Sequence, residues 1–112
     1  MISKALVAAS TKPLLLSILL DEEAYGYQII KQMKILSKGH LEWSFGMLYP
    51  VLHRLEKDGL ISSQWKESKK GRLRKYYRLT DKGQRELEKE KSQWLTVQGV
   101  LFKLWNSSET PS

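Results

Sequence analysis

The stretch of residues 44–80 reads SFGMLYPVLHRLEKDGLISSQWKESKKGRLRKYYRLT and contains the strongest fold signal of the chain. Its first part has apolar residues at the i, i+3, i+4 and i+7 spacing of one buried helical face, which predicts a helix. Its second part has two apolar and aromatic runs, residues 60–66 and 73–79, which predict two strands joined by the charged turn 67–72. The stretch therefore predicts a helix followed by a β-hairpin. The apolar helical positions are Leu48, Val51, Leu52 and Leu55.

The ends of this helix follow from its capping residues. Ser44 or Gly46 opens it, and Pro50 favours a late first turn near Met47, because proline has no N–H for a helix interior. Gly59 follows the last apolar position and suits the left-handed backbone that commonly ends a helix.

Two further helices are predicted upstream. An apolar face predicts the first over residues 5–20, where Pro13 either starts a new helix capped by Ser10 or Thr11 or kinks a longer one. The second covers residues 25–37. We expect its inward side chains to be Tyr27, Ile30 and Met33, with Ile29 beside them.

A long helix is predicted downstream, over residues 82–105, with Thr80 as its N-cap and Asp81 in its first turn. Two series of residues spaced by seven run along it, and other apolar side chains widen the face. One small domain cannot cover this face, so we expect it to bury against a second copy of the chain. The series are Leu87, Trp94 and Leu101, and Glu90, Val97 and Leu104, flanked by Leu95, Val100, Phe102 and Trp105.

The predicted order is helix, helix, helix, strand, basic turn, strand, helix. The first six elements are those of a winged helix-turn-helix, so the fold class is mostly α with a small β-hairpin (α+β). We predict a winged helix-turn-helix DNA-binding domain at residues 1–79, a C-terminal dimerisation helix at 80–106 and a flexible tail at 107–112.

The composition is that of an ordinary globular chain with its positive charge concentrated in one place. The 112 residues suit one domain, with 41% hydrophobic and 28% charged residues. The formal net charge is +7, and residues 60–79 alone carry +6, from seven basic residues and one acidic residue. A focused positive patch attracts a polyanion, and nucleic acid is the usual one.

The sequence does not have the features of a membrane protein or a secreted protein. The longest apolar run, residues 14–20, is interrupted by Ser17 and is shorter than the roughly 20 residues of a membrane span. The N-terminus has no signal-peptide pattern, and the absence of cysteine excludes disulfides and thiolate metal sites. We expect a cytoplasmic protein with no membrane partner and no cofactor.

Catalytic and metal chemistry is also weakly supported. His53 and Glu56 lie three residues apart on a predicted helix, and His40 and Glu42 flank a loop. Two ligands are too few for a zinc site, and no Ser-His-Asp set or glycine-rich phosphate loop is visible. The chain is therefore not predicted to be an enzyme, and no catalytic or metal site is assigned.

The helix predicted at the start of residues 44–80 is the candidate for insertion into the major groove of DNA, and the basic hairpin is the candidate for contacts with phosphates or the minor groove. Its N-terminal residues, 45–49, should lie closest to base edges, while Arg54 and Lys57 suit the DNA backbone. Tyr49 either donates to a phosphate or is a half-buried core aromatic, and the hairpin cations either bind DNA or only aid solubility. The helix candidates are Ser44, Met47, Tyr49, His53, Arg54 and Lys57, and the hairpin candidates are Lys69, Lys70, Arg72, Arg74 and Lys75.

Four motifs, in this order, resemble the PadR family of bacterial transcription regulators. They are YGY at residues 25–27, GMLYP at 46–50, RLEKDGLI at 54–61 and GRLRKYYRLTDKG at 71–83. The resemblance extends over about residues 10–105. It implies a winged helix, a homodimer joined through the C-terminal helix and repression of a neighbouring operon, often one for efflux or stress functions.

The resemblance also bears on single residues. Gly26 is expected to allow close approach of two helices, and Tyr77 to anchor the hairpin to the core. Many members have Ser or Thr where this chain has Met47, so one hydroxyl that could contact phosphate is absent. The short form with one C-terminal helix is similar to the multidrug-sensing branch, where a tryptophan at the place of Trp94 lines a drug pocket between subunits. Residues that either fill the dimer interface or hold a small aromatic effector are Trp94, Val97, Leu101, Leu104 and Trp105.

The alternative is a winged-helix module that binds protein or RNA and has no DNA operator. Binding to duplex DNA that weakens steeply with salt separates the two hypotheses. A two-fold dimer further predicts a pseudo-palindromic operator.

Overall fold

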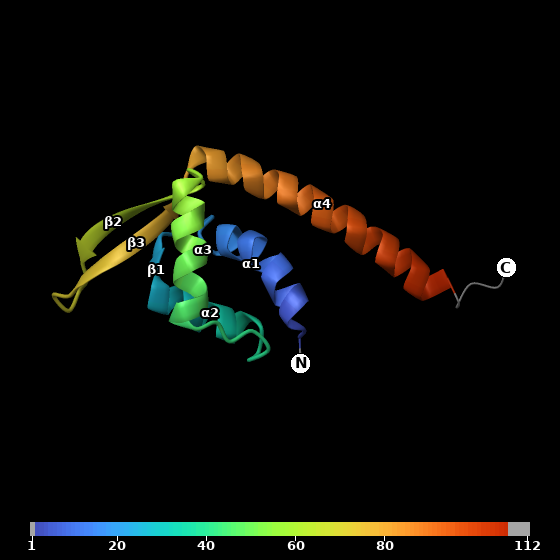
Figure 1. Cartoon of the computed structure of the whole chain (residues 1–112), viewed down its shortest axis with the longest axis horizontal. Coiled ribbons are helices and arrows are strands. Elements are labelled where there is room, and N and C mark those ends of the chain that lie inside the picture. Colours follow the sequence, from blue (N-terminus) through green and yellow to red (C-terminus); the bar gives the residue numbers. More distant parts are fainter. Residues whose placement is uncertain (1, 108–112) are drawn as a thin grey trace.

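Four helices and a three-stranded antiparallel sheet form the described part of this computed structural model, residues 2–107. The order confirms the winged helix-turn-helix followed by a long helix. Figure 1 shows α1, α2, α3 and the sheet gathered at one end, with α4 running away from them. Apart from Ser107, the predicted flexible tail lies outside the described residues. The elements are α1 (Lys4–Ile18), β1 (Ala24–Tyr25), α2 (Gly26–Leu36), α3 (Phe45–Lys57), β2 (Ile61–Glu67), β3 (Leu73–Leu79) and α4 (Asp81–Asn106).

The sheet contains a strand that the sequence did not predict. β1 pairs with β3, with Ala24 opposite Tyr77 and Tyr25 opposite Tyr76, and the strand order is β1-β3-β2. A strand of two residues shows no alternation of apolar and polar side chains, so periodicity cannot reveal it. Its consequence is that the base of the hairpin is tied to the start of α2.

The first helix is continuous through Pro13, as in the longer-helix alternative. The hydroxyl oxygen of Ser3 caps it, accepting from the Leu6 N–H at 3.2 Å, and it ends at Ile18, two residues before the predicted limit. Proline has no N–H for the carbonyl four residues earlier, and a helix tolerates that loss when its other turns are packed. Leu15, Leu16 and Leu19 supply this packing, because all three are buried.

The predicted late start of α3 near Met47 is wrong. The Ser44 hydroxyl accepts from the Met47 N–H at 3.2 Å, so the helix begins at Phe45 and Pro50 lies inside it. The side-chain cap satisfies one amide of the first turn, and the bond that Pro50 cannot make falls just after that turn. The rest of the prediction is confirmed, because Gly59 has φ +79° at the end of α3.

The core lies between the three N-terminal helices and the base of the hairpin. Tyr27 is not part of it and is 54% exposed, which contradicts the prediction for α2. Residues two apart on a helix point about 200° apart, so Tyr27 and the fully buried Ile29 cannot both face inward. The buried apolar residues include Leu15, Leu16, Ile29, Met33, Leu48, Leu52, Leu55, Ile61, Tyr77 and Leu87.

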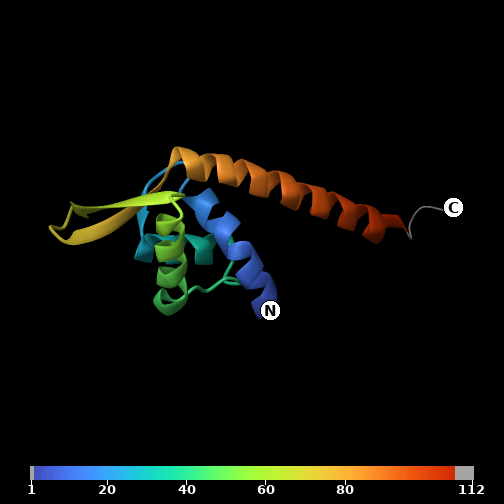
Figure 2. The same ribbon diagram turned by 45° about the horizontal axis from the view of Figure 1, so that its top comes forward.

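The start of α4 is fixed tightly to the domain. The Thr80 hydroxyl accepts from the Gly83 N–H at 3.0 Å and donates to the Gly59 carbonyl at 2.6 Å. Lys12 of α1 lies 3.7 Å from a Glu86 carboxylate oxygen and 3.5 Å from one of Glu90. Beyond these turns, α4 extends away from the other elements in both views (Figures 1 and 2).

No helix within residues 2–107 combines the length and the apolar content needed to cross a membrane.

Candidate nucleic-acid interface

The outward face of α3 is cationic and free. The buried residues Leu48 and Leu52 fix the inward side of the helix, which leaves the predicted candidates His53, Arg54 and Lys57 exposed. None of these three forms an ion pair with another described residue. They can therefore approach a polyanion without first breaking an internal contact.

The N-terminal end of α3 is held against α2. Tyr49 stacks on Phe45, with ring centroids 5.5 Å apart, and remains 47% exposed. Its hydroxyl would lie 3.1 Å from a Cβ added at Gly26, which confirms the close approach expected there. Of the other candidates at this end, Ser44 caps the helix and Met47 packs partly against the core.

The tip of the hairpin presents free cations. Gly71 adopts φ +80° in the turn, and the Ser68 N–H donates to the Arg72 carbonyl at 2.7 Å. The side chains of Lys69, Lys70 and Arg72 are exposed and form no ion pair with any residue the structure describes. The turn thus projects three positive charges beside α3.

The base of the hairpin is joined to α3 through Glu56. This carboxylate accepts a hydrogen bond from the Ser63 hydroxyl of β2 and lies 3.9 Å from the Lys75 ammonium of β3. Tyr77, which is 4% exposed, packs beneath them and anchors the hairpin as expected. Burial, followed by the nearby Tyr49 and Glu56, raises the pKa of the Tyr77 hydroxyl above 10.0. Lys75, predicted to contact DNA, therefore has an internal partner.

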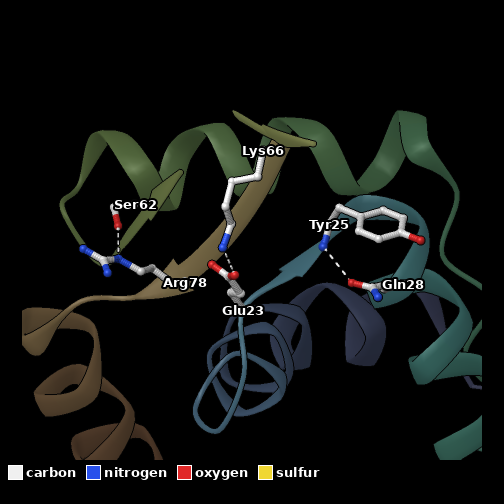
Figure 3. A network of polar contacts seen from close by, with 6 residues as sticks. All are labelled: Glu23, Tyr25, Gln28, Ser62, Lys66 and Arg78. Atoms are coloured by element: carbon white, nitrogen blue, oxygen red, sulfur yellow. Dashed lines mark hydrogen bonds and ion pairs between the residues drawn. The ribbon is translucent and has the colours of Figure 1, made fainter. Parts of the chain in front are cut away.

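The opposite face of the sheet carries a second set of supports, part of which is shown in Figure 3. Glu23 pairs with Lys66 of β2, and the Arg78 Nε donates to the Ser62 hydroxyl at 3.2 Å. The guanidinium of Arg74, another predicted DNA contact, lies 4.3 Å from the centre of the Tyr25 ring. Sequence reasoning missed Glu23 and Tyr25 as supports, because these contacts join distant segments. The one available signal was the YGY motif that contains Tyr25.

The predicted effector and dimer residues lie along one exposed side of α4, at Trp94, Val97, Leu101, Leu104 and Trp105. Trp94 also lines an apolar groove of about 370 Å³ between α1 and α4, together with Pro13, Leu14 and Leu87. Within residues 2–107 no cluster of three or more His, Cys, Asp or Glu side chains is arranged to hold a metal ion.

Known proteins resemble this chain in both fold and sequence. Residues 15–89 match the model of the transcriptional regulator PadR-like family. The crystal structure of a PadR-like transcriptional regulator from Bacillus cereus has a TM-score of 0.82 and 32% identity, covering 91% of this chain and 97% of that one.

Two curated relatives point the same way. A transcriptional regulator of Mycobacterium tuberculosis is 38% identical over 71 residues, which are 63% of each chain. The transcriptional regulator YqjI of Escherichia coli is 33% identical over 79 residues, which are 70% of this chain and 36% of YqjI. The family consists of transcription regulators rather than enzymes. The chain belongs to the PadR family of winged-helix, DNA-binding transcriptional regulators.

Proposed function

We propose that this chain acts in the cytoplasm as a homodimeric repressor. The proposed target is a neighbouring operon that encodes efflux or stress functions. In each protomer α3 enters the major groove, and the hairpin tip contacts phosphates or the flanking minor groove. The observation that carries this proposal is the set of exposed cations without ion pairs among the described residues. They are Arg54 and Lys57 on α3 and Lys69, Lys70 and Arg72 at the tip.

The dimer is proposed from the apolar side of α4. Val97 and Leu104 are more than half exposed on a helix that leaves the rest of the molecule, as Figure 2 shows. Water contact with such a stripe is unfavourable, and a second copy can cover it symmetrically. The two Trp94 side chains would then approach each other. Two-fold symmetry requires a pseudo-palindromic operator with half-sites about 34 Å apart, or a multiple of that spacing.

Salt dependence of binding tests the DNA contacts. The probe is a duplex selected by the protein from a random pool, with single-stranded RNA of the same sequence as the competitor. If the dimer engages about 6 to 8 phosphates, the log–log slope of affinity against salt should be roughly −5 to −7. A slope near zero, or equal binding to the RNA, would favour the module that binds protein or RNA.

A matched pair of variants locates these contacts. Lys70→Gln should reduce the size of the slope by roughly 0.9 for each phosphate that the protein then fails to neutralise. Lys4→Gln, an equal change of charge at the exposed start of α1, should leave the slope nearly unchanged. Equal slopes for the two variants would remove the hairpin tip from the interface.

A second function, response to a small aromatic effector, is favoured by the groove beside Trp94. Its lining is almost wholly apolar, and an indole face at its wall can stack on a planar ring. Acridine titrated into the dimer should quench tryptophan fluorescence and weaken operator binding. A Trp94→Ala protein that binds acridine with unchanged affinity would leave Trp94 with a packing role alone.

A further inference from the structure

The hairpin exposes two large apolar side chains that neither the core nor the cationic tip explains. Trp65 of β2 is 64% exposed and Leu73 of β3 is 69% exposed. Exposing a large aromatic side chain to water is unfavourable, and tryptophan is enriched at interfaces. Both residues lie near the tip of a hairpin that projects beyond α3 in Figure 1.

The register of the hairpin fixes the face on which these residues lie. Trp65 is directly opposite Lys75, and side chains two apart along a strand share a face, so Trp65 lies on the same side as Ser63. Ser63 and Lys75 both contact Glu56 of α3, which means that this side faces α3. Leu73 precedes Lys75 by two residues and is the diagonal neighbour of Trp65. The apolar pair thus continues the α3-facing side of the hairpin outward, beyond the end of the core.

The positive charge around Trp65 and Leu73 indicates which kind of partner this surface binds. Lys69, Lys70 and Arg72, which form no ion pair with a described residue, lie within a few residues of Trp65 and Leu73, and Glu67 is the one carboxylate of the turn 67–72. A second copy of this chain would bring the same cations together and be repelled. Duplex DNA combines phosphates for the cations with deoxyribose C–H groups for the apolar pair. Proteins that bind the minor groove frequently place apolar side chains in it.

We infer that Trp65 and Leu73 pack against the deoxyribose walls of the minor groove beside the site that α3 occupies. This inference rests on the proposed function, since it requires the hairpin to reach the duplex. The contact adds affinity that does not depend on salt, because it releases no counterions.

The salt titration separates this contact from the charged ones. With the selected duplex, Trp65→Ala should weaken binding about 10-fold at every salt concentration, the scale of exposing part of one large aromatic side chain, with an unchanged slope. Trp65→Phe should recover most of the loss. The control is Ile35→Ala on α2, which truncates a side chain of similar exposure, 66%, and should leave affinity unchanged. Because Trp65 is exposed, its variants should keep the thermal stability of the parent protein.

Direct observation of the ring completes the test. In protein labelled with 5-fluorotryptophan, the ¹⁹F resonance missing from Trp65→Phe identifies Trp65, and that resonance should shift when the duplex is added.

If Lys70→Gln changes the slope but Trp65→Ala leaves affinity unchanged, the inference fails and the proposed function stands. If neither variant changes binding, the proposed role of the hairpin fails as well. A Trp65→Ala protein that sediments as a monomer would show that a second copy covers this face, and would overturn the inference.

Discussion

Apolar side chains are buried where α3 meets the hairpin, whereas they are exposed along the outer half of α4. At the joint, Leu52 and Tyr77 are buried and Glu56 is held by two strand residues. On α4, the only buried residues are Gly83 and Leu87, and every apolar side chain from Trp94 onward is at least 37% exposed. The first region is completed by the chain itself, whereas the second has the composition of a core without a covering layer. An apolar helical stripe therefore predicts burial, but it does not identify the surface that covers it.

The largest effect is expected from a charge on the α4 stripe. In the proposed dimer, Leu101→Glu would bury a carboxylate between two α4 helices, which costs several kcal/mol, so that dimer should dissociate. Each protomer would then hold one half-site, and operator affinity should fall by roughly 100-fold or more. Sedimentation velocity measures the dissociation, and circular dichroism should show an intact domain. Ser92→Glu, on the opposite side of α4, is the control. If Leu101→Glu remains a dimer, the stripe is not the interface.

A pair of glycines on one helix provides the next test. An added Cβ at Gly83 would lie 1.9 Å from the Leu60 carbonyl oxygen, whereas at Gly99 it would meet nothing within 4 Å. Gly83→Ala should therefore destabilise the fold by about 3 kcal/mol, at the upper end for overpacking, because backbone atoms cannot rotate away. Gly99→Ala should stabilise it by about 0.5–1 kcal/mol through helix propensity.

Urea unfolding at one fixed protein concentration measures both glycine variants. Gly99 faces away from the apolar stripe, so its variant should also keep the proposed dimer. A destabilised Gly99→Ala protein would mean that another surface packs closely on that side of α4.

Local signals account for what the sequence predicted well. The spacing of Leu48, Val51 and Leu52 predicted the buried face of α3, and Thr80 and the charged residues 67–72 marked a cap and a turn where the structure has them. Each of these features depends on residues only a few positions apart, so the sequence displays them directly.

The features that were missed depend on contacts between distant segments. The pairing of β1 with β3 brings Tyr25 beside Tyr76, and no local pattern signals it. The sequence pattern indicates at most a weak metal ligand at Glu56 and a DNA contact at Lys75, and it does not indicate that the two side chains lie side by side, as they do in the structure. The positions of the candidate site were thus largely predictable, but which cations are free and which are held internally was not.

A smaller effect, on the salt dependence of DNA binding, is expected from Lys75, and it distinguishes cations held internally from free ones. Because its ammonium already faces Glu56, Lys75→Met should change the salt slope less than Lys70→Met, whose side chain forms no ion pair with a described residue. Losing the partly exposed ion pair between Lys75 and Glu56 should cost less than about 1 kcal/mol of stability. Operator titrations at several salt concentrations and thermal unfolding measure the two quantities. Equal slopes for the two variants would instead support Lys75 as a direct phosphate contact.

The smallest expected effect is on the free energy of unfolding at alkaline pH, and it depends on Tyr77. Burial, together with Tyr49 and Glu56, raises the pKa of its hydroxyl in the folded state above 10.0, so near neutral pH it is protonated in both states and contributes no pH dependence. Above about pH 10 the unfolded chain releases this proton first, and the free energy of unfolding falls until the folded protein ionises too. Tyr77→Phe has no such proton, so its stability should decline less steeply with pH than that of the wild type. Tyr27→Phe, at an exposed site, controls for the loss of one phenol. A Tyr77→Phe protein with the alkaline slope of the wild type would show that water reaches this joint as freely as it reaches α4.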